Sequence, residues 1–372
     1  MPVRRPSLIL TLLALPALAA CHRDAAPPPL DPQALAAVVA QPGITREPLA
    51  RAVDALFTDP AAAETRAVVV IHGGRLVAER YAPGFGRQTR FTGWSMAKCV
   101  TGVLIGLLAA DGRLKLDDPA PVAAWQRPGD PRGEITLREL LQMRSGLRHS
   151  EHADPIYAAD TVRMLFLDGR NDMAAYAEAQ PLSAEPGRTW QYSSATSVIL
   201  ADLAAQALTD SRDPAVRRQA TADYLRTRLF EPLGLKSMVP EFDAAGTLIG
   251  GSMIDATARD WAGFGEFLRN GGASRGTQVL PRSWLAFMTT PSPGNGAYGA
   301  HLWLNRVRPG KGEALFPREP PSDFACVGHL GQYLLVSPTR KLTIVRLGQT
   351  ADDARDPVRR RLGAIAALFP RG

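Results

Sequence analysis

The chain contains 372 residues, of which 45% are hydrophobic and 21% are charged. This length and composition are typical of a globular protein with one large domain or two small ones. The formal net charge is +7, but the positive side chains are mostly scattered, without a long run of Lys and Arg or a nucleic-acid-binding module. We therefore do not expect the chain to bind nucleic acid.

The first residues have the pattern of a secretory signal peptide. Two arginines precede an apolar stretch from Leu8 to Ala20, which is too short to cross a bilayer as a stable helix. The stretch ends in the sequence LAAC at Leu18–Cys21, which resembles the lipobox of bacterial lipoproteins. This resemblance implies lipid attachment at Cys21, whereas an ordinary signal peptide would leave the cysteine incidental.

This N-terminal pattern divides the chain into three parts. Residues 1–20 are the expected signal peptide, residues 21–45 the acylated cysteine with a Pro- and Ala-rich tether, and residues 46–372 the folded domain. Two or more acyl chains anchor a protein stably in a membrane. We therefore expect a lipid-anchored protein of the bacterial cell envelope that faces the periplasm.

Two β-rich regions lie at opposite ends of the domain. Near its start, Val68–Ile71 and Leu76–Tyr81 flank a Gly-Gly turn and predict a hairpin. Near the C-terminus, Phe324–Val336 and Leu342–Leu347 flank a second turn, and Tyr298–Val307 could add another strand.

Helical patterns fill the region between these strands. Apolar residues recur at helical spacing in Ser95–Asp111, and Gly112 follows as a C-cap. The other expected helices are Thr136–Met143, Thr196–Ala207, Ala220–Leu229 and Thr257–Asn270. The predicted fold class is therefore α+β, with an antiparallel sheet built from both chain ends, flanking helices and an inserted, mostly helical region at about residues 112–290.

The first of these helices begins with a Ser-x-x-Lys motif formed by Ser95 and Lys98. Residues three apart share a helix face, so the Lys98 amine can reach the Ser95 hydroxyl. Burial and the positive end of the helix both disfavour the ammonium form, which would let Lys98 accept a proton as Ser95 attacks. The motif alone fits a helix N-cap serine beside a solvated lysine equally well.

Two later segments could complete a site with this pair. Tyr192 lies in a polar loop just before an apolar helix and could relay protons, although a buried tyrosine with a satisfied hydroxyl is the commoner case. The segment Gly328–Gln332 lies in the C-terminal β-rich run, where glycine lets a ligand approach the backbone closely. A structural histidine is the alternative interpretation of His329.

The order of these motifs resembles the serine β-lactamase and penicillin-binding protein superfamily, whose signatures include Ser-x-x-Lys. The similarity runs from about Val68 to Gln349. It includes the stretches Asp111–Pro119, Ile135–Leu147, Phe230–Leu235 and Thr257–Asp260. Within the superfamily the chain is similar to the class C branch, above all to its esterase and 6-aminohexanoate-dimer (nylon-oligomer) hydrolase-like members.

This resemblance implies a serine hydrolase that forms an acyl-enzyme from an ester, amide or related small acyl substrate, without a cofactor. Ser95 would attack the acyl carbonyl, Lys98 and Tyr192 would share general-base work, and Tyr192 would protonate the leaving group. The main-chain N–H groups of Ser95 and Gln332 would form the oxyanion hole. The residues implied to bind the substrate are Ser194, His329 and Gly331.

Two departures from the superfamily pattern bear on the substrate. His329 stands where a carboxylate-binding Lys is usual, and Ser194 stands where class C β-lactamases carry Asn. A neutral His binds a carboxylate poorly near pH 7, so we expect ester or amide hydrolysis rather than efficient β-lactam hydrolysis. The alternatives are a β-lactamase or D,D-peptidase, and a non-catalytic envelope binding protein of the same fold.

Some residues near the motifs have more than one interpretation. Glu151 and Asp154 could recognise a cationic end of a substrate, although a solvated loop is the simpler interpretation. The sequence GWSMA at Gly93–Ala97 nearly matches the Gly-x-Ser-x-Gly elbow of α/β-hydrolases, in which His329 would be the general base. The absence of alternating strand and helix patterns around Ser95 argues against that enzyme class.

The remaining cysteines, Cys99 and Cys326, could form a disulfide in an oxidising compartment. We prefer to interpret both as small, buried apolar residues. No Cys/His cluster in the sequence has the spacing of a zinc site, so we predict no metal.

Overall fold

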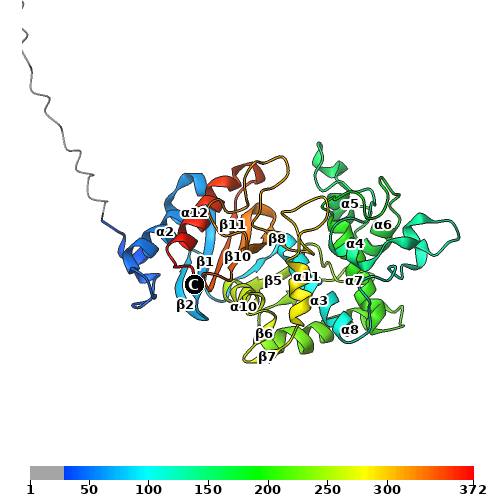
Figure 1. Cartoon of the computed structure of the whole chain (residues 1–372), viewed down its shortest axis with the longest axis horizontal. Helices are drawn as coiled ribbons and strands as arrows, with labels where there is room; N and C mark the ends of the chain where they lie inside the picture. Colours follow the sequence, from blue (N-terminus) through cyan, green and yellow to red (C-terminus); the bar gives the residue numbers. More distant parts are fainter. Residues whose placement is uncertain (1–28) are drawn as a thin grey trace, which may run out of the picture.

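The computed structural model describes residues 29–372, so the predicted signal peptide, the lipobox and Cys21 lie outside the described residues. The main sheet has six strands in the order β2-β1-β11-β10-β9-β8 (Figure 1). The strands are β1 Glu64–His72, β2 Arg75–Tyr81, β8 Trp303–Leu304, β9 Phe324–Gly328, β10 Gln332–Ser337 and β11 Leu342–Gln349. All five pairings are antiparallel, and β1 lies beside β11, which confirms a sheet built from both ends of the chain.

Both faces of this sheet are covered by helices. In β1, Val68 and Val70 contribute to one apolar core, while Ala67 and Val69 contribute to the core on the opposite face, as alternation along a strand requires. Helices α2 (Arg46–Thr58) and α12 (Arg355–Ala367) pack on the first face, and α10 (Ala258–Arg269) packs on the second. The alternating pattern of buried residues therefore places the sheet in the middle of a three-layer structure (Figure 1).

The region between β2 and β8 is mostly helical, as predicted. Its other helices are α3 Ala97–Ala110, α4 Leu137–Leu141, α5 Asp160–Phe166, α6 Met173–Glu178, α7 Ser194–Leu208, α8 Pro214–Leu225, α9 Glu231–Leu233 and α11 Arg282–Met288. Its short strands are β3 Arg90–Thr92, β4 Val239–Pro240, β5 Ile254–Thr257, β6 Ala273–Ser274 and β7 Thr277–Gln278. Strands β3, β5 and β4 form a small second sheet, and β6 pairs with β7.

The folded domain begins earlier than the predicted boundary at residue 46. Residues Pro32–Ala36 form α1, which is capped by the Asp31 side chain. Val38 is buried, and the backbone around it bonds to β2 through the pairs Val39 N to Val77 O and Glu79 N to Ala37 O. The later part of the predicted tether is thus an edge of the domain, because apolar Ala34 and Val38 are covered by packing against it.

Two predicted strands are shorter than expected. Only Trp303–Leu304 of Tyr298–Val307 forms a strand, and the run Phe324–Val336 is broken into β9 and β10 by a turn at His329–Gly331. Leu330 and Gly331 both have positive φ, 59° and 75°, which ends the extended conformation there. Among residues 29–372, no helix combines the length and the apolar character that crossing a membrane requires.

Candidate active site

Ser95 and Lys98 meet at the start of α3. Ser95 lies in a 3₁₀ turn, Trp94–Met96, and Lys98 lies in the first turn of the α-helix that follows it directly. The Lys98 side chain is 1% exposed, and its Nζ lies 3.0 Å from Ser95 Oγ. The solvated-lysine interpretation of the motif is therefore wrong, and the predicted contact between the two side chains is present.

The Lys98 amine is held by two further acceptors from distant parts of the chain. Its Nζ donates to Ser194 Oγ at 2.8 Å and to the Gly251 carbonyl at 2.8 Å. Burial lowers the pKa of Lys98 to about 8, although the negative charge of Glu151 opposes this effect. With that pKa about a tenth of Lys98 is neutral at pH 7, so the amine can act as a base.

Ser194, predicted to bind the substrate, instead lies inside the protein between Lys98 and Glu151. It is 1% exposed, and its Oγ donates to Glu151 Oε1 at 2.5 Å while its N–H donates to Glu151 Oε2 at 3.0 Å. The second carboxylate oxygen also contacts His149 Nε2 at 2.8 Å and accepts from Thr161 Oγ1 at 2.9 Å. Ser194 therefore positions the lysine and has little surface to offer a substrate.

The sequence named Glu151 only as a possible substrate contact or a solvated loop residue, and its place in this network was missed. Burial alone would raise the pKa of its carboxyl group, but the hydrogen bond from His149 and the charge of Lys98 outweigh burial and hold the pKa well below its usual range. Only 18% of the side chain is exposed. Glu151 is therefore a charged group inside the site, not the solvated loop residue expected, whereas Asp154 is exposed.

We predict that Glu151→Gln changes the pH dependence of hydrolysis as well as its rate. A neutral amide cannot replace the charge-assisted hydrogen bonds to Ser194, so kcat/KM at the pH optimum should fall about tenfold. Lys98 is active when neutral, so activity is lost as the pH falls through its pKa of about 8. Removing the nearby negative charge lowers that pKa, and the acidic limb of the pH–rate profile should move to lower pH.

A pH–rate profile of kcat/KM with a neutral ester measures this shift. Asp154→Asn, three residues away on the surface, is the matched control and should leave the limb in place. An acidic limb that stays at the wild-type position in the Glu151 variant, or moves to higher pH, would contradict the assigned role.

Tyr192 lies against the catalytic pair, as predicted. Its ring lies 4.8 Å from Lys98 Nζ, and it shares a side-chain hydrogen bond with Ser95. Burial and the charge of Glu151 raise the pKa of Tyr192 well above its usual range, although the bond with Ser95 lowers it somewhat. The hydroxyl group is therefore protonated near neutral pH and suits a proton donor better than a primary base.

An aromatic cluster surrounds Tyr192. Its ring centroid lies 5.6 Å from that of Trp303 and 5.9 Å from that of Tyr298. Trp190 stands 5.5 Å from Tyr298 and 6.3 Å from Trp303. Tyr298 is buried, whereas Trp303 is partly exposed and can therefore contact a ligand.

The third motif approaches the nucleophile through its first two residues. A Cβ on Gly328 would lie 2.2 Å from the carbonyl oxygen of Gly93, so only glycine permits this approach of β9 to the turn that carries Ser95. The ring of His329 lies 5.3 Å from that of Trp94. The close contact predicted for a glycine in this segment is present, at Gly328.

The other predicted residues of the third motif lie in and after the turn at His329–Gly331. Gln332, predicted to supply an oxyanion-hole N–H, lies in β10 between β9 and β11, where it pairs with Gly328. Its side chain exchanges hydrogen bonds with Gly348 of β11 at 2.7 and 3.0 Å. Gly331, predicted to bind the substrate, is buried, and its backbone packs against Arg346. Gly331 therefore has little surface to offer a substrate, whereas the role of the Gln332 N–H stays a prediction.

Arg346 holds that turn and was also missed. It is fully buried, and its guanidinium donates to the carbonyls of Gly331 (2.8 Å) and Glu64 (3.0 Å) and to the hydroxyls of Thr65 (3.0 Å) and Thr350 (2.8 Å). Burial lowers its pKa to about 10. A single arginine in an apolar strand carries no sequence motif, so only the structure shows that it fixes the third-motif turn.

Cys99 and Cys326 form a disulfide with Cα atoms 6.1 Å apart, within the usual range for such bonds. Our preferred interpretation of both as unpaired apolar residues was wrong. Cys99 follows Lys98 in α3, and Cys326 lies on β9 two residues before Gly328. The bond therefore ties the nucleophile helix to the strand that approaches it.

The α/β-hydrolase alternative does not fit this geometry. In that alternative His329 would accept the Ser95 proton, but the side chain that contacts Ser95 Oγ is Lys98, with Nζ at 3.0 Å, and the His329 ring packs on Trp94. The sheet is antiparallel, without the parallel strand–helix units of that class. Within residues 29–372, no group of three or more His, Cys, Asp or Glu side chains is arranged to hold a metal ion.

Comparison with known proteins agrees with the geometry. The family model for beta-lactamase matches residues 53–368. A 6-aminohexanoate-dimer hydrolase of Paenarthrobacter ureafaciens is 26% identical over 257 residues, which cover 66% of this chain and 63% of that protein. The match thus spans somewhat less than two thirds of the relative's own length.

Solved structures share the fold. A Bacillus anthracis protein assigned as a 6-aminohexanoate-dimer hydrolase superposes with a TM-score of 0.66 and 24% identity, covering 83% of this chain and 81% of its own. A family VIII carboxylesterase superposes with a TM-score of 0.62 and 17% identity, covering 87% of this chain and 97% of its own.

Proposed function

The chain belongs to the beta-lactamase family, and we propose that it is a serine hydrolase that cleaves ester or amide bonds through an acyl-enzyme on Ser95. The observation that carries this proposal is the contact of Lys98 Nζ with Ser95 Oγ at 3.0 Å, made by a buried amine whose pKa is about 8. A non-catalytic binding protein would have no need to keep a buried, partly neutral lysine against a serine.

The geometry supports a two-step reaction. Lys98 accepts the hydroxyl proton as Ser95 Oγ attacks the acyl carbonyl, and Tyr192, which is protonated and bonded to Ser95, passes a proton to the leaving group. The Lys98 ammonium then returns its proton to Tyr192. Water attacks the acyl-enzyme as Lys98 accepts a proton from it, and Tyr192 donates a proton to Ser95 Oγ as the acyl group leaves. The tetrahedral intermediates carry a negative oxygen that needs preorganised donors.

For that oxyanion hole we propose the main-chain N–H groups of Ser95 and His329. Gly328 brings β9 against the Ser95 turn, and His329 is the next residue along the chain. It is an alternative to Gln332, which begins β10 after the turn.

Several observations favour an ester or amide over a β-lactam. The His329 imidazole pairs with Asp352, so it does not take the place of the carboxylate-binding Lys. Ser194 is buried, so it does not take the place of the Asn that class C β-lactamases carry. The curated relative named above is a 6-aminohexanoate-dimer hydrolase and not a β-lactamase by name.

A substrate panel tests the proposed function. We expect a short-chain p-nitrophenyl ester to be turned over at least about tenfold faster, in kcat/KM, than the cephalosporin nitrocefin, because a charge-assisted contact to the β-lactam carboxylate is missing. Ser95→Ala is the blank and should lose both turnover and covalent labelling by a fluorophosphonate. Faster nitrocefin turnover would favour a β-lactamase, and no labelling of wild-type Ser95 would favour a binding protein.

We also propose that the protein acts in the bacterial cell envelope as a lipid-anchored, periplasm-facing enzyme. The support is the LAAC sequence at Leu18–Cys21 after an apolar stretch, together with the Cys99–Cys326 disulfide, since such bonds persist in oxidising compartments. Metabolic labelling with a fatty acid, compared between wild type and Cys21→Ala, tests the anchor.

A further inference from the structure

A chain of hydrogen bonds leads from the nucleophile to a buried histidine that the proposed reaction does not use. It runs from Ser95 through Lys98, Ser194 and Glu151 to His149, whose Nε2 lies 2.8 Å from Glu151 Oε2. The His149 side chain is 1% exposed. Each link joins groups whose protons can be assigned, so the direction of every hydrogen bond in the chain can be derived.

The direction of the chain is set at Glu151. Although burial opposes it, the hydrogen bond from His149 and the charge of Lys98 hold the pKa of this carboxyl group well below its usual range. Glu151 is therefore ionised and can only accept hydrogen bonds. The proton shared with His149 must lie on Nε2, and the proton shared with Ser194 must lie on Ser194 Oγ. Thr161 Oγ1 is a further donor to Oε2, at 2.9 Å.

This direction decides how the Lys98 amine is oriented. Ser194 donates its only hydroxyl proton to Glu151, so its Oγ can only accept from Lys98. The Gly251 carbonyl has no proton and also accepts from Lys98. A neutral amine has two N–H groups and one lone pair, so the lone pair is left for Ser95 Oγ, 3.0 Å away. A base needs this orientation to accept the Ser95 proton.

On packing grounds alone, His149 is an unfavourable residue at its position. Its Nδ1 is buried and has no hydrogen-bond partner among residues 29–372, and an unpaired buried polar atom destabilises the folded state. An apolar side chain would avoid this penalty. The contact that favours a histidine here is therefore the one that Nε2 makes with Glu151.

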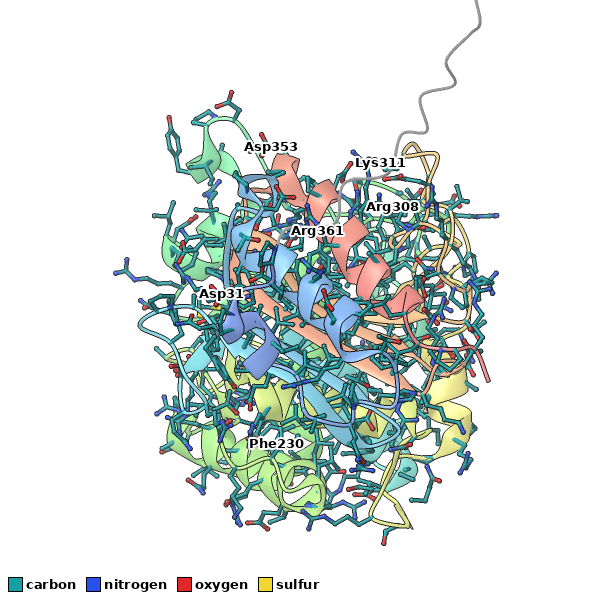
Figure 2. The ribbon with its side chains drawn as sticks, turned by 90° about the vertical axis from the view of Figure 1, so that its left-hand side faces the viewer. Asp31, Phe230, Arg308, Lys311, Asp353 and Arg361 are labelled. Atoms are coloured by element: carbon teal, nitrogen blue, oxygen red, sulfur yellow. A yellow bond between two sulfur atoms is a disulfide. The ribbon has the colours of Figure 1, made fainter. Side chains whose placement is uncertain are left out.

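The orientation of the Glu151 carboxylate depends on the donors around it and not on the loop that follows it. Residues 154–158 of that loop are exposed, and the loop projects from the domain in the upper part of Figure 2. The base of the loop is closed by Ser150, whose N–H and hydroxyl donate to Asp160 at 2.8 and 2.9 Å. These bonds fix the backbone, whereas the carboxylate itself is held by donors such as His149.

We propose that His149 is a positioning residue of the catalytic centre. By donating to Glu151 it fixes the direction of the hydrogen-bond chain, so that neutral Lys98 presents its lone pair to Ser95. This inference rests on the proposed hydrolase function and adds a residue that orients its base from outside the cleft.

The first test compares three substitutions of His149, with kcat and KM measured on a short-chain p-nitrophenyl ester. His149→Leu removes the donor and should lower kcat about tenfold, while KM changes less than about twofold. In His149→Gln the amide N–H can take the place of Nε2–H, so kcat should stay within about threefold of wild type. His149→Asn is also polar, but its amide corresponds to Nδ1, so it should behave like His149→Leu and serves in its place if that variant does not fold.

The matched control is His152→Leu. His152 lies three residues along the chain from His149, and its side chain is 76% exposed. This variant should have wild-type kcat and KM.

A double-mutant cycle tests whether His149 acts through Ser194. Ser194→Ala alone should lower kcat about tenfold, because one N–H of Lys98 loses its acceptor and can turn toward Ser95. Adding His149→Leu should then lower kcat by less than about twofold more, since the chain is already broken.

The outcomes separate this inference from the proposed function. Equal losses of kcat in His149→Leu and His149→Gln, or full additivity with Ser194→Ala, would show that His149 only packs, and wild-type kcat in His149→Leu and His149→Asn would show that it has no role. Either result overturns the inference and leaves the hydrolase intact. No ester turnover by the wild-type protein rejects the hydrolase itself.

Discussion

Lys98→Met should lower kcat/KM for ester hydrolysis by at least about 10³-fold, because it removes the base that accepts the Ser95 proton. Methionine nearly preserves the volume of the buried side chain, so the loss would report the amine and not a cavity. The same variant should react correspondingly slowly with a fluorophosphonate, because phosphonylation needs the same activated hydroxyl. Both rates are measured on protein whose circular dichroism spectrum matches that of wild type.

The control for this experiment is Lys115→Met, since Lys115 is solvent-exposed and pairs only at 3.8 Å with Asp118. It should leave both rates unchanged. Ester hydrolysis by Lys98→Met within tenfold of wild type would show that another group is the base, and the Ser-x-x-Lys mechanism would have to be abandoned.

Removing the Cys99–Cys326 disulfide should cost about 2–5 kcal/mol of folding free energy. The bond joins residues separated by 227 positions in the sequence. Its loss releases a long loop in the unfolded chain and so raises the conformational entropy of that chain. In the double variant Cys99→Ala/Cys326→Ala, urea unfolding should show this loss of free energy. A thermal melt of the same variant should show a fall in Tm on the order of 5 °C.

The experiment uses a background of Cys21→Ser, so that the two domain cysteines are the only thiols in question. A reductant should destabilise this parent protein and have no effect on the double variant. Titration of two free thiols in the unreduced, denatured parent would show that the disulfide is not formed.

Local sequence patterns predicted most of the scaffold. The helix over Ser95–Asp111 is present as α3, preceded by a short 3₁₀ turn, and the hairpin of β1 and β2 lies where the Gly-Gly turn placed it. Both predictions depend on spacing within a few residues along the chain, which sets helix faces and strand alternation. The wrong boundaries, at the tether and within Phe324–Val336, occur where packing against distant residues decides the backbone conformation.

The candidate site likewise contains residues that could be predicted from local spacing and residues that depend on tertiary packing. Ser95 and Lys98 could be paired from sequence because residues three apart on a helix share one face. The roles of Ser194 and Glu151 could not be predicted from the sequence, because they depend on how the loop before α5 packs against the start of α7. The turn at His329–Gly331 that precedes Gln332 could not be predicted either, because motif order does not reveal the backbone conformation.

The amino-acid sequence by itself thus determined the nucleophile, its lysine and the two-ended sheet, which rest on local periodicity and on motif order. The tertiary structure decided the protonation states and the surroundings of these residues. The pKa of Lys98, the ionised Glu151 and the buried Arg346 all depend on burial and on charges brought together from distant segments. Desolvation and Coulomb interactions act through space, so their balance is set only when the chain is folded.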